Sequence, residues 1–136
     1  MENKRTHLQM IQAIINRMAS NSFLLKGWSV VLVSALFALA AGDTQAPFVY
    51  LAYFPALAFW VLDGYFLWQE RLFRKLYNRV RAMAEGNIDF SMDTSVVHHD
   101  VPGWGAAALS KTLVIFHGTI VVSIAIVTLI ILLTKC

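Results

Sequence analysis

Three long apolar blocks constrain this chain more than any other feature of its sequence. They cover residues 23–41, 48–68 and 112–134, and each contains only one Lys, Asp or His side chain: Lys26, Asp63 and His117. A helix needs about 20 apolar residues to cross the roughly 30 Å hydrocarbon core of a bilayer. The sequence therefore predicts an all-α membrane protein with three transmembrane helices.

The composition excludes soluble and disordered alternatives. Charged residues make up 14% of the 136 residues and hydrophobic residues 58%, whereas a soluble domain carries about 25% charge. Cys136 is the only cysteine, so the chain can form neither a disulfide framework nor a cysteine metal cluster. A secretory signal would also explain the first block, but the amphipathic segment before it is too elaborate for one. We expect the first block to stay in the protein.

The basic residues predict the orientation in the membrane. Ten Lys and Arg residues lie before the second block or in the loop after it, and only Lys135 lies on the other side. By the positive-inside rule, the N-terminus and the loop over residues 69–111 are cytoplasmic and the C-terminus is external. Residues 42–47 form a short external turn.

Residues 1–22 predict a cytoplasmic amphipathic helix. Its apolar residues recur at helical spacing: Leu8, Ile11, Ile15 and Met18. Asn21 and Ser22 mark a possible break before the first span. Such a helix either lies on lipid, packs on the cytoplasmic loop, or forms oligomer contacts.

The second span is expected to continue directly into a basic helix. Its apolar stripe is Leu72, Leu76, Val80 and Met83, and its basic residues are Arg71, Arg74, Lys75, Arg79 and Arg81. One interpretation is a juxtamembrane segment that fixes orientation and touches anionic lipid. The other is a docking surface for a nucleic acid, since copies arranged in a ring would focus the positive potential. Both interpretations stay open.

The loop over residues 85–105 has a different pattern. Residues 88–93 alternate apolar and polar side chains, which predicts a strand, and Val96–Val97 could complete a short β-hairpin. A metal site could be drawn from Asp89, Asp93, His98, His99 and Asp100, but their spacing matches no zinc pattern, which favours a solvated loop. No nucleophile, phosphate-binding or HExxH motif is present, so we predict neither an enzyme nor a cofactor.

The three intramembrane ionisable residues lie at similar depth. Lys26, Asp63 and His117 all fall in the cytoplasmic third of their spans, and each stands beside a glycine: Gly27, Gly64 and Gly118. Such residues are costly in lipid and normally pair with one another. We predict a Lys26–Asp63 ion pair with His117 nearby, where neighbouring glycines permit close helix approach. The cluster is either a structural clasp or a polar vestibule that gates a pore.

A weakly polar stripe runs along the third span. It consists of Thr112, Thr119 and Ser123. Hydroxyls in a helix more often bond to their own backbone, but here they are also candidates for lining a pore. Because three helices cannot enclose a water path alone, such a pore requires a homo-oligomer, and Ile and Val around it would gate it by dewetting.

Three runs of residues resemble a family of small bacterial membrane proteins. They are NSFLLKGW at 21–28, FWVLDGYFL at 59–67 followed by Gln69–Glu70–Arg71, and NIDFSMDT at 87–94. The resemblance covers nearly the whole chain, and the second and third runs are its most specific parts. It associates the chain with two-gene anti-phage defence, as the membrane subunit of Hailong-type systems.

The resemblance implies an oligomeric ion channel of the bacterial inner membrane. Its signal would be a DNA oligomer or nucleotide made by a nucleotidyltransferase-like partner protein and bound by the five basic residues, with Lys26, Asp63 and His117 at the inner mouth. Two other classes stay open. A membrane scaffold that recruits a cytoplasmic protein would conduct no ions and tolerate Asp63→Asn. A proton-coupled carrier is disfavoured because the spans show no internal repeat.

Overall fold

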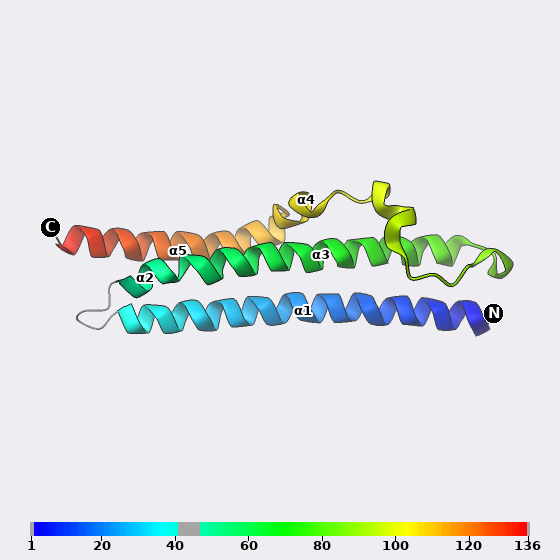
Figure 1. The fold of residues 1–136 in the computed structure, drawn as a ribbon, viewed down its shortest axis with the longest axis horizontal. Helices are drawn as coiled ribbons and strands as arrows, with labels where there is room; N and C mark the ends of the chain where they lie inside the picture. The colour runs from blue at the N-terminus through cyan, green and yellow to red at the C-terminus, as the bar shows by residue number, and fades with distance from the viewer. Residues whose placement is uncertain (1, 41–46, 136) are drawn as a thin grey trace.

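The protein is built from three long helices and a short connecting loop (Figure 1). The computed structural model describes residues 2–40 and 47–135. The order is α1 (Glu2–Ala40), α2 (Pro47–Leu51), α3 (Tyr53–Ala82), the 3-10 helices η1 (Glu85–Asn87) and η2 (Thr94–Asp100), α4 (Trp104–Ala108) and α5 (Lys111–Lys135). The expected turn over 42–47 lies outside the described residues, except for Pro47, and so do Ala41 and Cys136.

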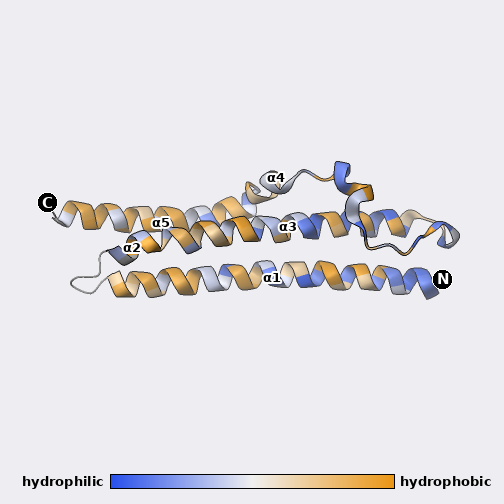
Figure 2. Ribbon diagram, in the orientation of Figure 1, coloured by the Kyte–Doolittle hydropathy of each residue, from blue (hydrophilic) through white to orange (hydrophobic). Residues whose placement is uncertain are grey.

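Three helices are long and apolar enough to cross a membrane, as the sequence predicts. They cover Glu2–Ala40, Val49–Ala82 and Lys111–Thr134. Helices α1 and α3 run side by side along the molecule, and α5 lies beside the first part of α3 (Figure 1). Figure 2 shows that the part containing α5 is mostly apolar, whereas the opposite end is mostly hydrophilic. We call these parts the apolar half and the polar end.

The possible break at Asn21–Ser22 is absent: α1 is one continuous helix of 39 residues. Neither residue is a proline or glycine, and the Ser22 hydroxyl bonds to side chains instead of to its own backbone. The expected continuity of the second span into the basic helix is confirmed by α3. The interruption lies earlier, at Ala52, where Pro55 has no N–H to donate to Leu51.

The polar end has a small core of its own. Ile11 and Ile15 from α1 pack with Leu76 and Val80 from α3, and the loop adds Ile88 and Val97 to the same cluster. The amphipathic segment of α1 therefore covers α3 and the loop. In the apolar half, a second cluster joins α1, α2, α3 and α5 through Val33, Val49, Ala52, Ala56 and Ile124.

The predicted β-hairpin is wrong: residues 85–105, all described, contain no strand, and Val96–Val97 lie in η2. Backbone N–H groups that a β-ladder would need donate instead to side chains two residues earlier in the chain. Asp89 accepts from the amide of Ser91 at 3.1 Å, and the Ser91 hydroxyl accepts from the amide of Asp93 at 3.0 Å. The alternation thus reflects consecutive side-chain turns rather than a pleat.

Asp93 continues the same series at the start of η2. Its carboxylate accepts hydrogen bonds from the backbone amide of Ser95 at 3.0 Å and from the hydroxyl of Ser95 at 2.8 Å. These bonds, the backbone one first, hold the pKa of Asp93 below its ordinary value. They therefore support η2 at neutral pH, where the carboxylate is ionised, and are lost as pH falls through that lowered pKa.

Lys4 fastens the start of α1 to the end of α3. Its ammonium donates to the carbonyls of Arg81 at 2.9 Å and Met83 at 2.7 Å, both at a helix end that lacks intrahelical partners. A cation is also favourable at a helix C-terminus. We expect Lys4→Met to destabilise this end by about 1–2 kcal/mol and to speed hydrogen exchange of the last α3 amides. Arg5→Met is the control, since within the described residues Arg5 forms only an exposed 3.6 Å pair with Glu2; equal exchange in both variants would contradict the prediction.

Candidate functional site

A buried carboxylate on one long helix contacts side chains from the other two long helices. Asp63 of α3 has no exposed surface. One carboxylate oxygen lies 2.6 Å from the ammonium of Lys26 on α1 and 2.7 Å from Nε2 of His117 on α5. The other oxygen accepts a hydrogen bond from the hydroxyl of Ser22. We call these four residues the charge cluster; the predicted ion pair and the nearby histidine are both present.

Ser22 is the member of the cluster that sequence reasoning missed. It lies one turn before Lys26 on α1, and the Lys26 ammonium donates to its hydroxyl at 2.8 Å. Ser22 therefore links Lys26 to the second oxygen of Asp63. The available signal was the i, i+4 spacing of Ser22 and Lys26, which places both side chains on one helix face.

His117 is held by aromatic rings as well as by Asp63. The ring of Trp60 stacks on it with centroids 5.8 Å apart and an interplanar angle of 12°, and Phe116 meets it edge-on at 5.1 Å. Nε2 faces the carboxylate, whereas Nδ1 is buried without a hydrogen-bond partner in the part of the chain that the structure describes. With Asp63 ionised, Nε2–H donates to its carboxylate.

Helix α4 supports the cluster from one side, alongside the part of α3 that lies in the second apolar block. The indole N–H of Trp60 donates to the carbonyl of Ala108 at 2.7 Å, and the indole N–H of Trp104 donates to the carbonyl of Val61 at 3.1 Å. Helix α4, part of the predicted loop over residues 69–111, thus packs beside the second apolar block. The apolar composition of residues 104–109 was the signal for this contact.

Only one of the three glycines permits close approach. A Cβ on Gly64 would lie 2.7 Å from Cβ and 2.9 Å from Cα of Ala108, so α4 packs directly on the α3 backbone. At Gly27 and Gly118 a Cβ would meet nothing within 4 Å. The prediction of close packing is thus confirmed for Gly64 and wrong for the other two within this chain.

Two of the three hydroxyls that are proposed to line a pore form hydrogen bonds within their own helix. Thr119 donates to the carbonyl of Ile115, and Ser123 donates to the carbonyl of Thr119 at 2.8 Å. Thr112 and Thr119 also line a groove of about 580 Å³ on the outside of the bundle, between α1 and α5. Within one chain this groove is open, so any pore along it requires further subunits.

The five predicted signal-binding residues divide into two groups. Arg74, Lys75, Arg79 and Arg81 are exposed on α3, whereas Arg71 is partly buried beside Ser22 and Lys26. Arg74 lies 3.6 Å from Glu70, and Arg79 lines a pocket with Asp89 and Asp93. The four exposed residues form what we call the basic surface, and its charge is partly offset by these carboxylates.

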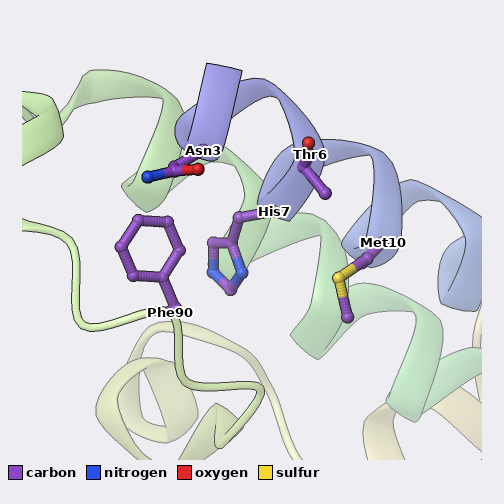
Figure 3. Close-up of a pocket in the computed structure, with 5 residues that line it drawn as sticks. All are labelled: Asn3, Thr6, His7, Met10 and Phe90. Atoms are coloured by element: carbon purple, nitrogen blue, oxygen red, sulfur yellow. The ribbon is translucent and has the colours of Figure 1, made fainter. Parts of the chain in front are cut away.

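A second pocket, which the sequence did not indicate, lies at the polar end (Figure 3). It has a volume of about 380 Å³ and is lined by Asn3, Thr6, His7, Met10 and Phe90. His7 is 3% exposed, its Nε2 has no hydrogen-bond partner among the described residues, and its ring meets Phe90 edge-on at 5.4 Å. Phe90 has a φ of 58°, an uncommon conformation for a bulky residue. The pocket thus combines a strained aromatic residue with an unsatisfied imidazole.

Comparisons with protein-family models, with curated proteins and with solved structures find no match for this chain. Among the described residues, no group of three His, Cys, Asp or Glu side chains is placed to hold a metal ion. The charge cluster and the basic surface are therefore the features on which a function for this chain can be based.

Proposed function

We propose that this protein is an oligomeric ion channel of the bacterial inner membrane, with its N-terminus in the cytoplasm. The observation that carries the proposal is the charge cluster. An ammonium from one long helix and an imidazole from another each lie within 2.7 Å of the same carboxylate oxygen of the third. Charged groups inside a membrane normally mark ion pathways, proton relays or gates.

The proposed conduction path runs between subunits. In a ring of copies, the groove between α1 and α5 would face a shared axis, with Thr112 and Thr119 supplying its polar lining. The charge cluster would stand at the cytoplasmic mouth of that path. Rearrangement of the Lys26–Asp63 pair would then change the charge at the mouth and so gate the channel.

The proposed signal is a DNA oligomer or nucleotide bound by the basic surface. Four exposed cations on one helix, repeated around a ring, suit a polyanion better than a single phosphate. In the defence setting that the sequence suggests, a nucleotidyltransferase-like partner would make this signal. Arg71 is less available to it, because its side chain is partly buried between helices.

Single-channel recording from purified protein in planar bilayers tests the proposal. We expect discrete current steps that short DNA oligomers modulate. In the variant R74Q/K75Q/R79Q/R81Q the step size should persist while modulation is lost, and the salt dependence of oligomer binding should fall by up to about 3 in log–log slope. Arg17→Gln removes an exposed cation from α1 and is the matched control.

Each alternative outcome contradicts a defined part of the proposal. Steps that ignore DNA and RNA oligomers would retain the channel and discard the signal. Silence from folded, oligomeric protein would favour a membrane scaffold. One observation favours that second function: Thr119 and Ser123 donate to carbonyls within α5 and so are not held toward a water path.

A further inference from the structure

A small polar pocket lies next to the charge cluster, where α1, α3 and the start of α5 meet. Its volume is about 210 Å³, and its polar lining comes from Ser22, Lys26, Glu70, Arg71, Ser110 and Thr112. We call it the junction pocket. It lies between the polar end and the apolar half, because Arg71 follows the second apolar block and Thr112 begins the third.

Two groups in the junction pocket have unused bonding capacity: the Arg71 guanidinium and the Ser110 hydroxyl. The pocket's other charged side chains are paired, because Lys26 lies 2.6 Å from Asp63 and Glu70 lies 3.6 Å from Arg74. Arg71 forms no ion pair within the described residues, although it is partly buried. The Ser110 hydroxyl oxygen is also buried and has no hydrogen-bond partner in residues 2–40 and 47–135. A free guanidinium beside an unsatisfied hydroxyl suits a phosphate group, which accepts hydrogen bonds and carries negative charge.

The junction pocket adjoins the groove between α1 and α5, since Thr112 lines both. The groove begins at Lys111 and continues past Ile115 and Thr119, with Val30 on its opposite wall. Its lining is otherwise apolar, and α5 leads from Lys111 into the apolar half (Figure 2). A cationic, polar site thus passes into a mostly apolar groove that extends into the apolar half.

We propose that this combined site binds one anionic glycerophospholipid from the leaflet next to the polar end. Its phosphate lies in the junction pocket against Arg71 and Ser110, and one acyl chain lies along the groove. Charge complementarity selects an anionic lipid, because Lys111 at the groove entrance would meet the cation of a zwitterionic headgroup. The site is defined within one chain and does not depend on channel function; an acyl chain in the groove would occupy the proposed conduction path and so block it.

Native mass spectrometry of the delipidated full chain in detergent tests the site. With phosphatidylglycerol added, we expect one retained lipid per chain, bound about tenfold more tightly than phosphatidylcholine. Both lipids carry the phosphate, but the choline cation of phosphatidylcholine would meet Lys111 at the groove entrance. Inorganic phosphate at the same concentration should not displace it, which separates a lipid headgroup from a free anion. Equal retention of the two lipids would overturn the proposal without any variant.

Variants locate the lipid within the site. Arg71→Gln should weaken phosphatidylglycerol binding about tenfold, and Ile115→Trp should weaken it by filling the groove, while the exposed Arg17→Gln should not. An equal loss in Arg17→Gln would indicate surface electrostatics and contradict the site. A second copy is the competing occupant: cross-linking through Thr119→Cys in a Cys136→Ser background, together with loss of the lipid, would also contradict it. Circular dichroism confirms that each variant is folded.

Discussion

Replacing Asp63 with asparagine is expected to destabilise the bundle by about 3 kcal/mol. The substitution keeps the shape of the side chain but leaves the Lys26 ammonium without its counter-charge in the apolar half. Removing one partner of a buried ion pair costs about 3–5 kcal/mol, because the remaining charge stays desolvated. The lower figure applies because the Lys26 side chain is 20% exposed and can move toward water.

A double-mutant cycle separates this mechanism from lost packing. Lys26→Met alone should also destabilise, whereas the pair Lys26→Met with Asp63→Asn should recover part of the stability, since no unpaired charge remains. The measurement is reversible unfolding in detergent micelles, followed by circular dichroism. Asp89→Asn in the exposed loop is the control. Additive effects of the two substitutions would show that the pair is uncoupled, and an unaffected Asp63→Asn would support the scaffold function.

The sequence predicts the charge cluster because the physics of lipid makes its members conspicuous. A lysine, an aspartate and a histidine inside apolar blocks are each unfavourable unless they meet. Their similar depth follows from counting residues along straight helices, so the sequence alone predicts that Lys26, Asp63 and His117 lie close together. Ser22 gave no such signal, because a serine is tolerated in a membrane helix with or without a partner.

The alternation of apolar and polar residues led to a wrong prediction because two different local structures have the same periodicity. Residues 88–93 alternate as a strand does, yet Asp89, Ser91 and Asp93 use that period to form successive turns. Helix α4 was missed for another reason: residues 104–108 are too few to register as a span. Their position depends on Gly64, whose missing side chain has meaning only once its neighbour is known. The continuity of α1 likewise depends on α3, which both of its halves contact.

Substitution of Gly64 with alanine is expected to displace α4 and destabilise the bundle by about 1–3 kcal/mol. The added methyl would lie 2.9 Å from Cα of Ala108, a backbone atom that cannot turn aside. Moving α4 would weaken the hydrogen bond from Trp60 to Ala108. Because Trp60 also stacks on His117, the shift would reach the charge cluster. Unfolding in detergent and tryptophan fluorescence measure the two effects.

The chain supplies matched controls for this prediction. Gly27→Ala and Gly118→Ala add the same methyl group where nothing lies within 4 Å, so each should be neutral or gain up to about 1 kcal/mol from helix propensity. Ala108→Gly should rescue Gly64→Ala only in part, because it removes the 2.7 Å contact with Cβ but not the one with Cα. If Gly64→Ala matched the other two glycine variants, α4 would not pack on α3 as described, and the support for Trp60 and His117 would have to come from elsewhere. Destabilisation by all three would instead point to contacts with neighbouring subunits at Gly27 and Gly118.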